Sequence, residues 1–167
     1  SAARNSVGDL EHYVALFFDI SERKEHEAKL EYIAYYDALT GLPRRGLLTK
    51  ILREKMDKAQ KENTKILVLL IDIDNFKSIN DKYGHAIGDT LLVSLAQKIQ
   101  LLLKEGDVFG RLSGDEFLVI TQENEDYNTQ IRTLEELLLH IATPLYIENH
   151  ILHVTASIGI VSYQIGR

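Results

Sequence analysis

The stretch RLSGDEFLVI, Arg111 to Ile120, predicts a β-hairpin with two acids just past its turn. Ser113-Gly114 can make the turn, because glycine adopts positive φ without steric penalty. Asp115 and Glu116 then open the second arm. Adjacent strand residues point to opposite faces, so both acids face one site only if the turn distorts the strand. For this stretch taken alone, the usual outcome is a surface hairpin with solvated acids.

A second acid-bearing strand end lies upstream, in LLIDIDNFKSINDKYGHAIGD (Leu69–Asp89). Asp72 and Asp74 are two residues apart, so in a strand they share a face. The alternative is that one of them caps the following turn or helix. If this strand neighbours the hairpin, Asp72, the Ile73 carbonyl and Asp115 offer three oxygens to a hard cation such as Mg²⁺. Two such ions could clamp an in-line displacement at phosphorus.

Polar residues after this strand are candidates for contacts to a base. The amide of Asn80 and the carboxylate of Asp89 can pair with the donors and acceptors of a guanine edge. Asp89 is equally explained as an acid near a helix N-terminus, and Lys77 as a solvated surface lysine. The histidines are scattered, without metal-binding spacing.

The order of apolar and polar periodicity predicts an α+β fold with a mainly antiparallel sheet and helices on its faces. Lys65–Ile73 is apolar almost throughout, as in a central strand buried on both faces. The other expected elements are a helix within Gly84–Lys104, hairpin arms at Asp107–Leu112 and Glu116–Thr121, a helix over Tyr127–Ile141, and a second hairpin joining Leu145–Ile147 to Ile151–Val161.

The N-terminal part has a different character. His12–Ile20 has the aromatic and β-branched residues of a strand, and residues 21–36 predict a charged connector helix. One strand cannot form a domain, so residues 1–20 are interpreted as the tail of an upstream domain. The alternative is a stray strand that pairs with the main sheet.

Composition narrows the function classes. The chain has 167 residues, a net charge of −6 and no cysteine. This charge argues against a non-specific nucleic-acid binder, and the absence of cysteine excludes disulfides. The longest apolar run, Ile66–Ile71, is too short to cross a membrane. Together these features predict a cytoplasmic segment that binds no nucleic acid or membrane.

The chain from about Asp37 to Gly159 resembles the GGDEF (diguanylate cyclase) family. Five strings carry the resemblance: DALTGLP (Asp37–Pro43), LIDIDNFKSIND (Leu70–Asp81), YGHAIGD (Tyr83–Asp89), GDVFGRLSGDEF (Gly106–Phe117) and TASIGI (Thr155–Ile160). The resemblance implies a GGDEF domain over 37–167 and an adenylyl-cyclase-like (ferredoxin-like) sheet with a signature hairpin. FFDISERKEHEAKL is similar to the end of a PAS domain, and residues 140–160 resemble GGDEF domains that precede an EAL phosphodiesterase.

The resemblance also implies an activity, the condensation of two GTP into cyclic di-GMP across a homodimer. By resemblance, Mg²⁺ or Mn²⁺ would be held by Asp72, the Ile73 carbonyl, Asp115 and Glu116, and Glu116 with Asp115 would be catalytic. The GTP contacts that it implies are Asn75, Phe76, Lys77, Asn80, Asp89 and Gly114.

Three departures from the family pattern bear on this activity. Ser113 stands where the family has glycine, and its Cβ is unfavourable if φ is positive. Lys104 and Asp107 occupy the family's inhibitory product site, where lysine lacks the bidentate fork of arginine. The sequence stops at Arg167, before a lysine and an arginine that meet phosphates in the family, so a truncated domain is expected.

Three hypotheses remain open from the sequence. The first is a diguanylate cyclase domain that requires Mg²⁺ and a homodimer. The second is a non-catalytic GTP-binding module that regulates an attached EAL phosphodiesterase. The third is a structural dimerisation module between a sensor and an effector.

Overall fold

The computed structural model describes residues 2–4, 10–13, 21–123 and 127–164. The chain divides into two compact units, 1–32 and 33–167. In the first unit, β1 (Ala2–Arg4) pairs antiparallel with β2 (Leu10–Tyr13). The expected strand at 12–20 lies outside the described residues from position 14 onward. The helix expected over residues 21–36 is α1 (Ser21–Tyr35).

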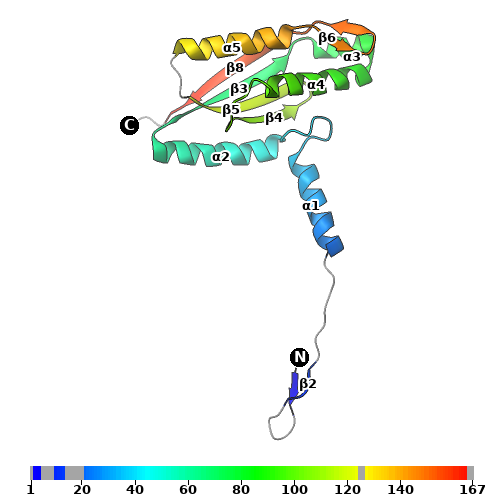
Figure 1. Cartoon of the computed structure of the whole chain (residues 1–167), viewed down its shortest axis with the longest axis vertical. Coiled ribbons are helices and arrows are strands. Elements are labelled where there is room, and N and C mark those ends of the chain that lie inside the picture. Colours follow the sequence, from blue (N-terminus) through cyan, green and yellow to red (C-terminus); the bar gives the residue numbers. More distant parts are fainter. Residues whose placement is uncertain (1, 5–9, 14–20, 124–126, 165–167) are drawn as a thin grey trace. The chain divides into compact units, whose positions relative to one another are not determined.

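The second unit is built on a four-stranded sheet in the order β4-β5-β3-β8 (Figure 1). Its strands are β3 (Lys65–Ile73), β4 (Val108–Ser113), β5 (Glu116–Glu123) and β8 (Ala156–Tyr163). Every pairing in this sheet is antiparallel, and β3 pairs with both β5 and β8, so it lies between them. The predicted α+β class with an antiparallel sheet is therefore confirmed.

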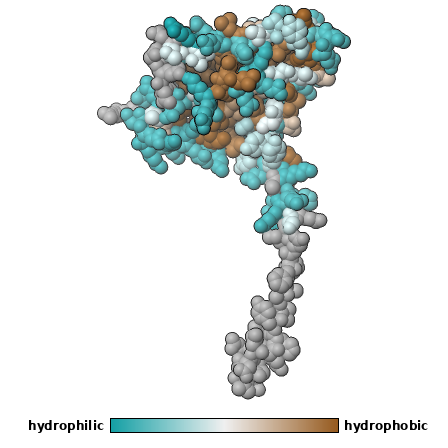
Figure 2. All heavy atoms as spheres, viewed as in Figure 1, coloured by the Kyte–Doolittle hydropathy of each residue, from teal (hydrophilic) through white to brown (hydrophobic). Residues whose placement is uncertain are grey.

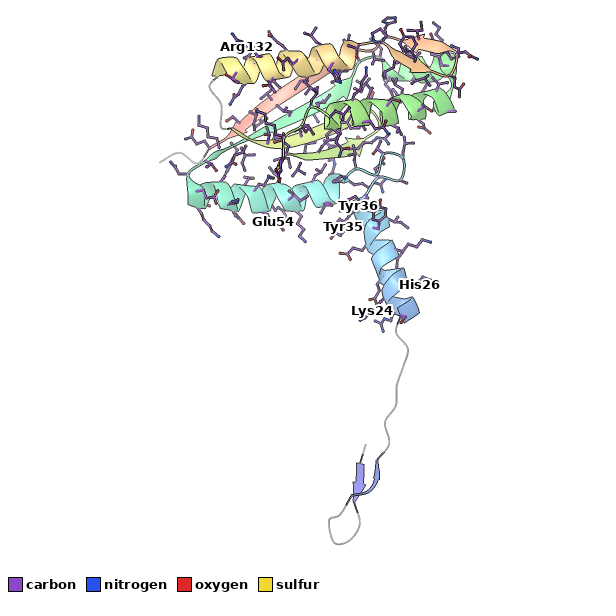
Figure 3. All side chains as sticks on the ribbon, viewed as in Figure 1. Lys24, His26, Tyr35, Tyr36, Glu54 and Arg132 are labelled. Carbon is purple, nitrogen blue, oxygen red and sulfur yellow. The ribbon has the colours of Figure 1, made fainter. Side chains whose placement is uncertain are left out.

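Helices cover both faces of the sheet. Successive side chains of β3 point to opposite faces, so each face presents apolar residues that a helix can bury. Leu67, Leu69 and Ile71 join the larger apolar cluster, to which α4 (His85–Gln100) and α5 (Tyr127–Ala142) contribute buried leucines and isoleucines. Ile66 and Val68 belong to a smaller cluster with α2 (Arg45–Glu62). The helices turn charged residues away from the sheet, as Glu54 of α2 and Arg132 of α5 illustrate in Figure 3.

Two element predictions needed correction. The only helix expected between β3 and the signature hairpin was the one within Gly84–Lys104, but α3 (Phe76–Tyr83) forms a separate helix before α4. The second hairpin, expected to join Leu145–Ile147 to Ile151–Val161, is instead a short hairpin followed by a separate strand of the main sheet. β6 (Leu145–Ile147) pairs with β7 (His150–Leu152) around the turn at Glu148, whose φ is 51°. β8 starts only at Ala156 and joins the main sheet beside β3.

β3 is also less buried than an entirely apolar strand implies. Leu70 is 39% exposed, and Asp72 is exposed at the end of the strand. The end of β3 therefore reaches solvent where the predicted site lies. Within the described part of the chain, no helix combines the length and hydrophobicity that a membrane crossing requires.

Candidate functional site

The turn of the signature hairpin accommodates serine without backbone strain. Gly114 is the turn residue in the left-handed region, with φ of 43°, whereas Ser113 has no positive φ. The register of β4 and β5 shifts between Arg111 and Ser113, which brings Ser113 opposite Glu116. The steric penalty considered for a Cβ at position 113 therefore does not arise.

Arg111 connects this turn to Asp37, near the start of the domain, through hydrogen bonds and an ion pair. Its Nε and Nη2 donate to the Gly114 carbonyl at 2.9 and 2.6 Å, and its Nη1 meets Asp37 Oδ1 at 2.8 Å. Its backbone N–H also donates to the Pro43 carbonyl. Both partners of the ion pair are well covered, with side chains 12% and 15% exposed. This role of Arg111 was not predicted from the sequence.

The acids of the two strand ends lie close together, as predicted for neighbouring strands. Asp72 is the cross-strand partner of Glu116, and the Ile73 N–H donates to the Asp115 carbonyl at 3.2 Å. Burial raises the pKa of Asp72, and the negative charges of Asp115, Glu116 and Asp74 raise it further. A cation bound between these carboxylates would relieve their repulsion.

The donor chemistry fits Mg²⁺ or Mn²⁺, which prefer carboxylate and carbonyl oxygens. In the residues that the structure describes, no three carboxylate or imidazole groups are gathered tightly enough to form a ready metal site. Asp72, Asp115, Glu116 and the Ile73 carbonyl remain the group that could hold the ion. Side-chain rotation on binding would have to bring their oxygens together.

Asp74 has a different role from Asp72. It accepts hydrogen bonds from the hydroxyls of Thr155 at 2.6 Å and Ser157 at 2.8 Å. These bonds lower its pKa, Thr155 having the larger effect. Its N–H donates to the Thr155 carbonyl. Asp74 thus joins the end of β3 to β8, and the two acids of the DxD string do not converge on one ligand.

The residues expected to meet phosphates lie where α3 begins. Asn75 precedes the helix in the left-handed conformation, with φ of 58°, and makes no side-chain cap. Phe76 is buried, while Asn75 and Lys77 are exposed. A helix N-terminus whose N–H groups lack a capping side chain presents donors to an anion.

Asn80 has an unsatisfied acceptor. Its Oδ1 is buried and, among the described residues, has no hydrogen-bond partner. The atom lies against Gly88 of α4, so closely that a Cβ added to that glycine would collide with it. Asp89, the next residue, is exposed. A buried acceptor beside an exposed acid fits recognition of a ligand with adjacent N–H donors, as a guanine edge has.

The loop that contains Lys104 and Asp107 is stabilised by an internal hydrogen bond between these two residues. Asp107 Oδ2 accepts a hydrogen bond from the Lys104 N–H at 2.9 Å, and Lys55 Nζ donates to the Gly106 carbonyl at 2.8 Å.

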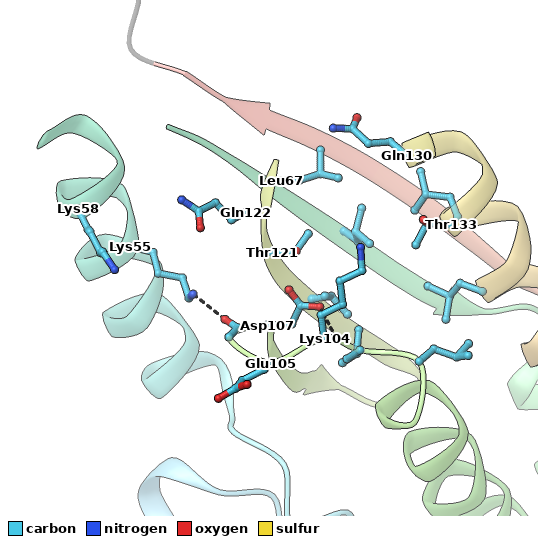
Figure 4. A pocket seen from close by; sticks show the side chains of 17 residues that line it. Lys55, Lys58, Leu67, Lys104, Glu105, Asp107, Thr121, Gln122, Gln130 and Thr133 are labelled. Atoms are coloured by element: carbon cyan, nitrogen blue, oxygen red, sulfur yellow. Dashed lines mark hydrogen bonds between the residues drawn. The ribbon is translucent and has the colours of Figure 1, made fainter. Parts of the chain in front are cut away.

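A cavity of about 320 Å³ lies beside this loop (Figure 4). Figure 2 shows apolar side chains on the same face, over the sheet between α5 and α2. The cavity is lined by apolar residues that include Leu67, Leu69, Val119, Leu134 and Leu137.

The comparisons with known proteins point to one family. The family model described as "Diguanylate cyclase, GGDEF domain" matches residues 34–166. The chain is 36% identical over 135 residues to the bifunctional diguanylate cyclase/cyclic di-GMP phosphodiesterase MucR of Pseudomonas aeruginosa, covering 81% of this chain and 20% of that protein. It is 38% identical over 130 residues to the diguanylate cyclase DgcP of Escherichia coli, covering 78% and 38%. It therefore spans well under half the length of these two relatives.

A solved structure shows the same architecture. The diguanylate cyclase SiaD of Pseudomonas aeruginosa, solved in complex with its activator SiaC, aligns with a TM-score of 0.73 and 32% identity. The alignment covers 89% of this chain and 59% of that one.

Proposed function

Because the chain belongs to the GGDEF (diguanylate cyclase) domain family, we propose that its acidic strand ends form part of a cyclase site. The substrate is GTP, and two GTP molecules held by two copies of the domain condense to cyclic di-GMP. The observation that carries the proposal is the pairing of Asp72 with Glu116 across β3 and β5, beside Asp115.

Each residue has a role in this proposal. Mg²⁺ or Mn²⁺ would be held by Asp72, the Ile73 carbonyl, Asp115 and Glu116, and would supply Lewis-acid stabilisation of charge at the α-phosphate. Glu116 would orient the 3′-hydroxyl of the GTP on the partner subunit and accept its proton. That oxygen attacks the α-phosphorus, and pyrophosphate leaves.

Other residues would contact the nucleotide in this proposal. The N–H groups around Asn75, Phe76 and Lys77 contact phosphates, and Gly114 lets the nucleotide approach the turn closely. Asn80, whose Oδ1 has no partner among the described residues, and Asp89, whose carboxylate is exposed, recognise guanine in this proposal. Since GTP is the proposed substrate, the proposed location of the domain is the cytoplasm.

The proposed domain arrangement is that of a longer signalling protein. Residues 1–20 are the tail of a PAS-like domain, 21–36 connect it, and 37–167 are a GGDEF domain. An EAL phosphodiesterase domain follows. The relative named as bifunctional, with both cyclase and phosphodiesterase activity, supports this last point.

A second candidate function is a GTP-binding module that makes no product and regulates the attached EAL domain. The observation that favours it is that no three acids are preassembled for a metal within the described residues. Such a module needs the guanine contacts of Asn80 and Asp89 but not turnover.

Product analysis of the full-length protein separates the two functions. The protein is incubated with GTP and Mg²⁺, the products are separated by chromatography, and Glu116→Gln serves as the control. Cyclic di-GMP from the parent but not from the control supports the cyclase. GTP binding detected by calorimetry without cyclic di-GMP formation supports the regulatory module. If the protein neither binds GTP nor forms product, both candidate functions are contradicted.

A further inference from the structure

The serine of the signature turn has a hydrogen-bonding partner that glycine could not engage. Ser113 Oγ donates to Glu116 Oε2 at 2.5 Å. We propose that Ser113 is a positioning residue that orients the Glu116 carboxylate for binding of the metal–nucleotide complex. This inference rests on the proposed function of the site, since it assigns Ser113 a part in that same chemistry.

The backbone holds the two residues in register without strain. Ser113 and Glu116 are cross-strand partners on either side of the two-residue turn. The positive φ of the turn falls on Gly114 and not on Ser113. Directly opposed residues have Cβ atoms about 4.5–5.5 Å apart, which suits a bond between a short hydroxyl side chain and a glutamate. The contact therefore follows from the hairpin geometry.

The contact acts on one oxygen of the carboxylate. Glu116 is also the cross-strand partner of Asp72 on β3, so its side chain has Ser113 on one side and an acid on the other. With Oε2 held by the hydroxyl, Oε1 accepts no other hydrogen bond from the described residues. The second oxygen is thus oriented in advance and left for an incoming ligand.

Orientation in advance matters because glutamate is a flexible side chain. Fixing it on binding loses rotamer freedom, which is a general penalty on affinity. A charge-assisted hydrogen bond made before binding removes part of that penalty. Glycine at position 113 leaves Glu116 free to rotate. The serine hydroxyl therefore gives the Glu116 carboxylate a defined orientation before the ligand binds.

The test compares three substitutions at one position in the full-length protein. Ser113→Ala and Ser113→Gly remove the hydroxyl, while Ser113→Thr keeps it and suits a strand. Binding of GTP with Mg²⁺ is measured by calorimetry, and kcat and KM are measured wherever product forms. We expect Ala and Gly to weaken binding about three- to tenfold, below the range for a charged hydrogen bond because the site is exposed, and Thr to restore it.

Two controls separate positioning from a structural role. Ser94→Ala removes a similar hydroxyl whose bond, to the Thr90 carbonyl, lies within α4, and it should leave affinity unchanged. In a Glu116→Ala background, Ser113→Ala should have no further effect on affinity, because its partner is gone. Thermal unfolding midpoints of Ser113→Ala and Ser113→Thr should match that of the parent, whereas Ser113→Gly has a lower midpoint because glycine destabilises a strand.

The outcomes distinguish this inference from the proposed function. If the parent binds GTP and all position-113 variants bind it equally, the positioning role is wrong while the function stands. The role is also wrong if Ser113→Ala weakens binding by the same factor without Glu116. If the parent binds no GTP, the proposed function fails and the inference fails with it.

Discussion

At the residue scale, Arg111 makes the largest set of defined contacts at the site. One planar guanidinium bonds the Gly114 carbonyl twice and Asp37 once. Lysine keeps the charge but has a single ammonium, which cannot reproduce this fork. Arg111 therefore fixes the signature turn against the start of the domain through geometry as well as charge.

Arg111→Lys should accordingly destabilise the domain by about 1–2 kcal/mol, because bonds between charged groups and covered partners are lost. Urea unfolding measures this change. The matched control is Arg23→Lys, in the exposed Arg23–Glu27 pair whose side chains are 80% and 61% exposed. That change should stay within about 0.5 kcal/mol. Equal losses in both variants would contradict the locking role.

The same ion pair gives a pH dependence. Burial acts to raise the pKa of Asp37, but hydrogen bonds from Thr40 and then Arg111 outweigh it, and the pKa falls below the ordinary 3.8. The stability contributed by Asp37 is therefore full above pH 3.8 and is lost as the pH falls through the lower, folded-state pKa. The difference in unfolding free energy between the parent and Asp37→Asn should shrink over that range. A difference that is flat with pH would contradict this.

Substitution of Asp72 should change stability and ligand affinity in opposite directions. Its pKa is raised, so its charge disfavours the folded state at neutral pH. Asp72→Asn should raise the free energy of unfolding slightly, by ~0.5 kcal/mol or less since the group is exposed, and should weaken GTP–Mg²⁺ binding strongly. Denaturant titration and calorimetry on one preparation check both. A variant that loses stability would contradict the repulsion.

At the element scale, the contact of α3 with α4 depends on Gly88. A Cβ there collides with Asn80 Oδ1, so Gly88→Ala should displace the Asn80 amide and destabilise the domain by about 1–3 kcal/mol. GTP affinity should fall at least as far as in Asn80→Ala. In Gly46→Ala, on α2, the added Cβ has no atom within 4 Å. It should be neutral or stabilising, by up to about 1 kcal/mol. An unchanged affinity in Gly88→Ala would argue against Asn80 as a base contact.

The sequence predicted elements well where local patterns decide them. The α+β class, the antiparallel sheet and the signature hairpin follow from periodicity and from Gly114. The division at residues 150–156 did not follow, because β8 is defined by pairing with β3 and not by its own pattern. Arg111 was missed for the same reason, since its partner Asp37 is 74 residues away. The individual roles of Asp115, Glu116, Asn80 and Asp89 stay predictions.

At the scale of the whole molecule, the folded core belongs to the second unit. Among the described residues, both apolar clusters draw only on positions from Leu39 onward. Deleting residues 1–32 should therefore change the free energy of unfolding of the remaining domain by no more than about 0.5 kcal/mol. Urea unfolding of the two chains, followed by a far-ultraviolet signal, checks this. A loss of several kcal/mol would show that the first unit contributes to the core.

The bond between Asp74 and Thr155 spans 81 residues of chain, and this has a consequence during synthesis. A ribosome adds roughly 5–20 residues per second, so Asp74 emerges about 4–16 s before Thr155 can join it. Until then, the end of β3 has no partner strand on its β8 side. The acids of β3 are among the first parts of the site to be made, yet the strand end that carries them is completed last.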